Sequence, residues 1–249
     1  MEAIEVVSSR FSPLAIDGAI RNVCRALERN NRETPRWESL SEDFLWREIV
    51  SCILGSRVHF SLALSAIERM ASSDLFSRKS RTSANQRYER DIVNALWGTA
   101  GKPGIPELKN RYPFPILRAR QIRNAAEKFY SNGNSIRSML QEASNPRDVR
   151  RYLASEVSGL GPKQASLFLR NIGYASYIAV LDVHVLAYMN WAGLTKIPMK
   201  TVPTLKRYEE LENTFIEHSC SFGFPPDNFD IAVWVVVRVA KKEDEGWRW

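Results

Sequence analysis

The amino-acid sequence predicts an all-α protein, and two observations support that prediction. Apolar residues recur at spacings of three and four from one end of the 249-residue chain to the other, which is the period of amphipathic helices. Runs with the two-residue alternation of a half-buried strand are nearly absent. The β-branched stretch 231–239 could pass for a strand, but it has no hairpin partner nearby, so we assign it to a buried helix.

Local start and stop signals bound the predicted helices. Ser41 is a good N-cap because Glu42 and Asp43 follow it in the first turn, and Asp182 stands in the same way before an apolar run. Four prolines make residues 98–115 a loop with short turns. In chain order, the predicted helices cover residues 14–30, 42–54, 58–71, 84–97, 115–131, 135–143, 147–158, 163–172, 183–193, 205–221 and 227–241.

The composition excludes several classes of protein. Hydrophobic residues make up 44% of the chain and charged residues 25%, as in an ordinary globular protein. No apolar run is long enough to span a bilayer, and the chain starts with acidic residues, the reverse of a secretory signal peptide. We therefore expect no membrane association and a reducing compartment, either the cytoplasm with its nucleoid or, in a eukaryote, the nucleus.

The cysteines and histidines give no sign of a transition-metal site. Cys24, Cys52 and Cys220 lie far apart, so they cannot form a four-cysteine zinc site, an iron–sulfur cluster or a disulfide framework. None of the three histidines has a second ligand at a suitable spacing. We expect buried apolar cysteines, no zinc and no iron–sulfur cluster.

Positive charge is concentrated in one segment. The whole chain has a formal net charge of +7, and residues 78–128 contain twelve basic and four acidic residues. The remainder contains 23 basic and 24 acidic residues, so this segment carries the entire excess. A basic stripe is typical of a protein that binds a polyanion, although an Arg-rich, solvated helix face would have the same composition.

Residues 158–163 predict a tight turn between two helices. We expect the first helix to end at Ser158, Gly159 to adopt a left-handed conformation and Pro162 to begin the second helix. Glycine at 159 and 161 lets a ligand approach the backbone closely, and the N–H groups at a helix start can hold a phosphate. The pattern indicates a helix-hairpin-helix that grips a nucleic-acid backbone.

Lys163 has two interpretations. A cation is disfavoured in the first turn of a helix, so the lysine needs a reason to be there. It could contact a DNA phosphate, or the helix dipole and burial could lower its pKa and make the neutral amine a nucleophile. The hairpin alone favours the phosphate contact. Asp182, which follows 19 residues later, shifts the balance because a carboxylate there could stabilise a sugar cation or orient the amine, besides capping a helix.

The motif Gly159-Leu160-Gly161-Pro162-Lys163, followed by Leu181-Asp182-Val183-His184, resembles the signature of the helix-hairpin-helix-GPD DNA glycosylases. Among these it is similar to the lysine-bearing 8-oxoguanine DNA glycosylase/AP lyases, and the segment 170–173 resembles their archaeal-type branch. The resemblance implies two helical domains, residues 40–173 and residues 1–39 with 174–249, with the DNA and lesion pocket in a cleft between them.

The resemblance also implies a reaction. The damaged nucleotide is flipped out of the duplex, Lys163 attacks C1′ and displaces the base, and the resulting Schiff base allows β-elimination that nicks the strand. Asp182 would assist formation of the sugar cation, while Gly159 and Gly161 would hold backbone phosphates. A monovalent cation, Na⁺ or K⁺, would bind the backbone carbonyls of three residues, Ser155, Val157 and Leu160.

Further site residues follow from the same resemblance. Arg57 stands where the family places its partner-base reader, and Trp234 where relatives place an aromatic against the flipped base; an ordinary helix-end arginine and a core tryptophan are the alternatives. His184 would touch a phosphate or pack on its helix. The chain ends at Trp249 instead of the lysine of archaeal-type relatives, so its terminal carboxylate is assigned to the base pocket by position only.

Together these features predict a monomeric base-excision repair enzyme, a bifunctional DNA glycosylase/AP lyase that acts on double-stranded DNA containing 8-oxoguanine. The alternative is a non-catalytic helix-hairpin-helix module in which Lys163 only contacts a phosphate. The spacing between Lys163 and Asp182 favours the enzyme.

Overall fold

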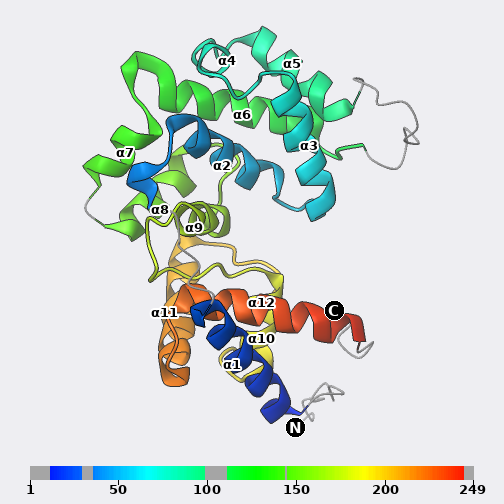
Figure 1. Cartoon of the computed structure of the whole chain (residues 1–249), viewed down its shortest axis with the longest axis vertical. Helices are drawn as coiled ribbons and strands as arrows, with labels where there is room; N and C mark the ends of the chain where they lie inside the picture. Colours follow the sequence, from blue (N-terminus) through cyan, green and yellow to red (C-terminus); the bar gives the residue numbers. More distant parts are fainter. Residues whose placement is uncertain (1–11, 30–35, 99–110, 144, 244–249) are drawn as a thin grey trace. The chain divides into compact units, whose positions relative to one another are not determined.

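The computed structural model describes residues 12–29, 36–98, 111–143 and 145–243, and its regular elements within these ranges are all helical (Figure 1). The prediction of an all-α protein is therefore confirmed. The α-helices are α1 (Pro13–Arg29), α2 (Glu42–Leu54), α3 (Phe60–Ser72), α4 (Arg78–Thr82), α5 (Gln86–Trp97), α6 (Pro115–Tyr130), α7 (Ile136–Glu142), α8 (Pro146–Glu156), α9 (Pro162–Asn171), α10 (Val183–Trp191), α11 (Leu205–Phe222) and α12 (Pro226–Glu243). Two short 3₁₀ helices, η1 (Trp37–Ser39) and η2 (Ser131–Gly133), complete them.

The helix boundaries agree closely with the caps read from the sequence. The Ser41 side chain accepts a hydrogen bond from the backbone N–H of Phe44, so α2 begins as predicted. The stretch 231–239 lies inside α12 and is helical. The five-residue helix α4 was not predicted, because so short a segment contains too few residues to display a helical period.

The chain divides into two compact units. Residues 34–174 form one, called here the central unit, and residues 1–33 together with 175–249 form the other, the terminal unit. The sequence placed the domain boundaries after residues 39 and 173. Each unit is built around its own set of buried apolar side chains, and each is described by itself below.

Helix α2 is the centre of the central unit. It packs against α3, α6, α7 and α9, and its buried side chains include Leu45, Trp46, Ile49 and Ile53. A helix surrounded on several sides is apolar around most of its circumference. The remaining helices α4, α5 and α8 join this assembly through α6, α3 and α9.

Helix α12 organises the terminal unit. It packs against α1, α10 and α11 (Figure 1). The buried core of this unit includes Ile20, Tyr188, Phe215, Phe229 and Val233. In the described ranges no helix combines the length and the apolarity that crossing a membrane requires.

Candidate active site

The predicted hairpin is present in the central unit, where α8 and α9 pack together. Helix α8 ends at Glu156, two residues before the predicted end at Ser158, because Val157 already leaves the helical conformation (φ −103°, ψ 108°). Leu160 is buried as an apolar plug, and Pro162 occupies the first position of α9. A missing proline N–H costs nothing there, since the first N–H groups of a helix have no intrahelical partner.

The two glycines of the hairpin differ in backbone conformation and in the space around them. Gly159 adopts φ 94°, and a Cβ at this position would lie 3.1 Å from the side chains of Gln121 and Ile53. Gly161 adopts an extended conformation that any residue can take (φ −98°, ψ 180°), and a Cβ there would meet nothing within 4 Å. Packing therefore explains Gly159, whereas the described part of the chain does not require glycine at 161.

Lys163 lies in the first turn of α9 and is half-buried. Its cation acts on the thiol of Cys52, a fully buried residue of α2. Burial raises the pKa of that thiol well above its usual range, and the carboxylate of Glu48 raises it further. The positive charges of Lys163 and Arg170 oppose this rise, which places the lysine close to a dry part of α2.

The residue after the lysine fixes the start of α9. Gln164 is buried, and its Nε2 donates a 2.6 Å hydrogen bond to the carbonyl oxygen of Cys52. Because this bond ties the first turn of α9 to α2, the backbone that carries Lys163 is held by two helices. Sequence reasoning missed Gln164, since a lone glutamine after a lysine carries no signal of its own.

Asp182 lies in the terminal unit, where it is the N-cap of α10 as predicted. Its Oδ1 accepts hydrogen bonds from the backbone N–H groups of His184 (2.8 Å) and Val185 (2.9 Å). Both cap bonds use the same oxygen, which leaves Oδ2 for another partner. The capping role and a chemical role are therefore compatible in one carboxylate.

Buried polar side chains hold the extended segment that leads to Asp182. The backbone N–H groups of residues 179, 180 and 181 donate to Glu212 Oε1 (3.0 Å), Asp230 Oδ2 (2.7 Å) and the Tyr208 hydroxyl (3.0 Å). Buried backbone groups must be paired, and here side chains replace a neighbouring strand. These contacts were not predicted from the sequence, because the three side chains belong to α11 and α12, far along the chain from residues 179–181.

In the terminal unit, Trp234 of α12 contacts His184 of α10 and Arg238 of its own helix. The rings of His184 and Trp234 lie edge to face, with centroids 6.2 Å apart and an interplanar angle of 89°. The guanidinium of Arg238 lies 4.8 Å from the centroid of the Trp234 ring. Trp234 is 37% exposed, so it is a partly open aromatic surface and not a fully buried core residue.

The other predicted site residues fall in several places. Arg57 is exposed in the loop between α2 and α3, and its backbone takes the left-handed conformation at φ 60°. Ser155, Val157 and Leu160 lie at the end of α8 and in the hairpin turn. Trp249 lies outside the described residues.

The basic segment 78–128 is partly neutralised by internal contacts. Two of its arginines, Arg81 and Arg118, are buried. Four more basic residues form ion pairs with acidic neighbours, namely Arg87, Arg120, Arg123 and Lys128. Within the described part of the segment, the exposed basic residues without an ion pair are Arg78, Lys79, Arg90 and Arg111. Two more basic residues of the segment, Lys102 and Lys109, lie outside the described residues.

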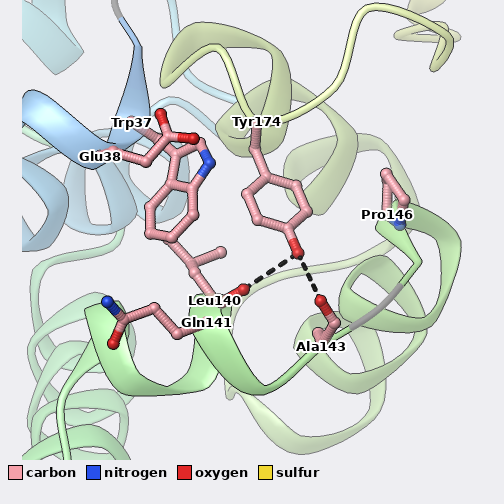
Figure 2. Close-up of a pocket in the computed structure, with 7 residues that line it drawn as sticks. All are labelled: Trp37, Glu38, Leu140, Gln141, Ala143, Pro146 and Tyr174. Carbon is pink, nitrogen blue, oxygen red and sulfur yellow. Dashed lines mark hydrogen bonds between the residues drawn. The ribbon is translucent and has the colours of Figure 1, made fainter.

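One cavity in the central unit involves none of the predicted site residues. Its volume is about 490 Å³, and it is lined by Trp37, Glu38, Leu140, Gln141, Ala143, Pro146 and Tyr174. Figure 2 shows the Trp37 and Tyr174 rings side by side and the Tyr174 hydroxyl pointing to two backbone carbonyls. The ring centroids lie 5.5 Å apart, and the ring planes are tilted by 55°. That hydroxyl donates toward the oxygens of Leu140 (3.1 Å) and Ala143 (3.2 Å), so this polar group is already used structurally. Among the described residues, no three His, Cys, Asp or Glu side chains are grouped to hold a metal ion.

Comparisons with known proteins agree on one family. A family model described as 8-oxoguanine DNA glycosylase matches residues 105–224, which include the hairpin, Lys163 and Asp182. An 8-oxoguanine DNA glycosylase/AP lyase of Sulfurisphaera tokodaii is 30% identical over 211 residues, covering 84% of this chain and 89% of that protein.

Solved structures share the fold. The 8-oxoguanine DNA glycosylase of Thermotoga maritima superposes with a TM-score of 0.65 at 22% identity, covering 89% of this chain and 97% of that one. The 8-oxoguanine glycosylase/lyase of Methanocaldococcus jannaschii, in complex with a 15mer DNA containing 8-oxoguanine, superposes with a TM-score of 0.67 at 19% identity, covering 89% and 96%. These likenesses support the helical architecture derived above.

Proposed function

The chain belongs to the family of 8-oxoguanine DNA glycosylase/AP lyases, and on that premise we propose that it excises 8-oxoguanine from double-stranded DNA and then cleaves the abasic strand. The observation that carries the proposal is Lys163 in the first turn of α9, directly after a hairpin whose backbone is open at Gly161. A lysine in this position combines a nucleophilic nitrogen with N–H groups that can hold a phosphate.

In the proposed reaction, Lys163 is the nucleophile. The lone pair of its neutral amine forms a bond to C1′ as the C1′–N9 bond breaks. The base leaves with the two electrons of the C1′–N9 bond and takes up a proton. Opening of the sugar ring moves the amine proton to O4′ and leaves a Schiff base. Loss of a proton from C2′ then expels the 3′ phosphate, which is the β-elimination that nicks the strand.

Asp182 is proposed to stabilise the positive charge that develops on the sugar. Its Oδ2 is available for this because both cap bonds fall on Oδ1. The buried side chains that hold residues 179–181 keep the carboxylate in place before substrate arrives, which is the condition for effective electrostatic stabilisation. The flipped base is proposed to stack on Trp234, on the ring face opposite Arg238.

A monovalent cation is the other group that the family resemblance implies. The carbonyl of residue 155 lies in the last turn of α8, where helix carbonyls lack intrahelical donors. Residues 157 and 160 add two oxygens from the turn, and the Val157 oxygen also accepts a 3.1 Å hydrogen bond from the backbone N–H of Leu160. Oxygen atoms at the negative end of a helix dipole suit a hard cation, so these residues fit such an ion. When bound, it would supply positive charge beside the hairpin for a DNA phosphate.

Reductive trapping tests the proposed nucleophile. Borohydride reduction on a duplex with one 8-oxoguanine should give a covalent protein–DNA adduct, and Lys163→Gln should abolish it. Lys206→Gln is the matched control, because Lys206 is the second residue of α11 just as Lys163 is the second residue of α9. The control should trap fully. An undiminished adduct in Lys163→Gln would contradict the assignment, and no adduct from the wild-type protein would favour a non-catalytic DNA-binding module.

Asp182→Asn separates the two roles of the carboxylate. Asparagine is as good an N-cap as aspartate, so α10 should remain intact while the negative charge is lost. We expect single-turnover excision to slow by about two orders of magnitude, the usual cost of one lost electrostatic contact in a transition state. A rate within a factor of a few of the wild type would limit Asp182 to capping.

A further inference from the structure

The end of α2 and the loop that follows it are held by an unusual set of hydrogen bonds. Three carbonyl oxygens at alternate positions, on Cys52, Leu54 and Ser56, each accept a 2.6 Å bond from a side chain. The donors are the amide of Gln164, the hydroxyl of Tyr112 and the guanidinium of Arg118, and all three are buried. The helix end is thus fastened by groups from three separate segments of the central unit.

Arg118 is the donor closest to the exposed part of the loop. Its Nη2 bonds to the carbonyl oxygen of Ser56, and its Nη1 bonds to Gln121 Oε1 at 2.7 Å. Gln121 is one of two side chains, with Ile53, that pack against Gly159 in the hairpin. One buried guanidinium therefore joins the loop after α2 to the residue that supports the hairpin turn.

The residue immediately after Ser56 is strained. Arg57 has φ 60°, a left-handed conformation that is unfavourable for any residue with a Cβ. Its exposed guanidinium makes no hydrogen bond or ion pair within the described part of the chain. Such strain persists only where the surroundings impose it, and it is found most often at functional positions. The bonds to Leu54 and Ser56 fix two carbonyl oxygens shortly before Arg57 in the chain.

We propose that Arg118 is a positioning residue, which locks the loop so that Arg57 is presented to the DNA in a fixed place. The proposal rests on the proposed function, since it assigns a DNA contact to Arg57. The guanidinium of Arg118 bonds to oxygen atoms inside the protein, so Arg118 would act on DNA only through the position of Arg57. Tyr112 holds the loop in the same way two residues earlier in the chain, because its hydroxyl fixes the carbonyl of Leu54.

A double-mutant cycle tests this role, because a merely structural residue would not be coupled to Arg57. Arg57→Ala should reduce single-turnover excision about 10- to 100-fold, the size of one hydrogen bond to a charged group. Arg118→Met should cause a similar loss in the wild-type background. In the Arg57→Ala background, the same Arg118→Met change should have an effect of no more than about twofold, the usual limit of additivity.

Two further variants keep the test decisive. Tyr112→Phe is a milder change that retains the ring, and its loss should also disappear in the Arg57→Ala background. Arg120→Met removes a charge from the same helix, but Arg120 is exposed and pairs with Glu89, so its effect should add to that of Arg57→Ala. Thermal unfolding of each variant identifies those that remain folded.

Additive losses for both Arg118→Met and Tyr112→Phe would overturn the proposal, while excision by the wild-type protein would leave the proposed function standing. If the wild-type protein excises no 8-oxoguanine, the proposed function fails. The same cycle, measured as affinity for undamaged duplex, then still tests the role of Arg118, with coupling supporting it and additivity contradicting it.

Discussion

Two segments of the central unit require a left-handed backbone conformation, and they use different residues for it. The segments are the hairpin turn between α8 and α9 and the loop between α2 and α3. Each contains one residue at positive φ, Gly159 at 94° and Arg57 at 60°. At residue 159 a side chain is excluded, because a Cβ would lie 3.1 Å from two neighbours. At residue 57 the side chain is exposed to solvent. The left-handed backbone conformation of this residue costs about 1–2 kcal/mol relative to a relaxed backbone.

Packing explains why residue 159 is a glycine, whereas the described residues do not explain why residue 57 is an arginine. Packing alone accounts for Gly159. Arg57 makes no hydrogen bond or ion pair within the described residues, and the proposed contact with DNA would supply one. Gly161 resembles Arg57 in this respect, since a Cβ there would meet nothing within 4 Å. Three measurements test this distinction.

The largest effect is expected at Gly159. Gly159→Ala should lower the free energy of unfolding by about 2–5 kcal/mol, from a left-handed alanine at about 1–2 kcal/mol and overpacking against Gln121 and Ile53 at about 1–3 kcal/mol. Gly161→Ala should change stability by less than about 1 kcal/mol, because its conformation suits alanine and the small loss is a poorer N-cap. Denaturant unfolding measures both, and equal losses would remove the contrast.

The next effect concerns strain at Arg57. Arg57→Gly should stabilise the protein by about 0.5–1 kcal/mol net, because glycine relieves the left-handed strain but adds entropy to the unfolded chain. The same variant should bind DNA more weakly, which is a trade between stability and function. Asp74→Gly is the matched control at φ 55°, where aspartate tolerates the conformation, so no gain is expected. A destabilised Arg57→Gly would show that the arginine stabilises the fold itself.

The smallest effect separates shape from charge. Gly161→Ala should weaken binding to undamaged duplex by the same factor at 50 and 200 mM salt, because it removes no charge. Arg78→Gln, which removes one of the exposed basic residues without an ion pair, should reduce the slope of log affinity against log salt by about 0.9 if it contacts a phosphate. Fluorescence titrations across that salt range measure both slopes. An unchanged slope in Arg78→Gln would remove this residue from the DNA interface.

Local patterns predicted much of the candidate site. The cap at Asp182, the left-handed Gly159 and Pro162 at the start of α9 all depend on residues within a few positions of one another. The exact end of α8 and the existence of α4 were missed, because a two-residue difference and a five-residue helix leave almost no trace in a periodic pattern. The contact between His184 and Trp234 joins α10 to α12, so no local pattern could predict it.

The helices, their caps and the hairpin that carries Lys163 follow from the amino-acid sequence alone, because helical period and capping chemistry act over one or two turns. The buried polar groups that hold the site in place follow from tertiary packing. The bonds from Gln164 to Cys52, from Arg118 to Ser56 and from Val180 to Asp230 join residues 112, 62 and 50 positions apart. Such pairs form because packing brings a donor to a backbone group that must be satisfied, and nothing in the neighbourhood of either residue records where its partner will lie.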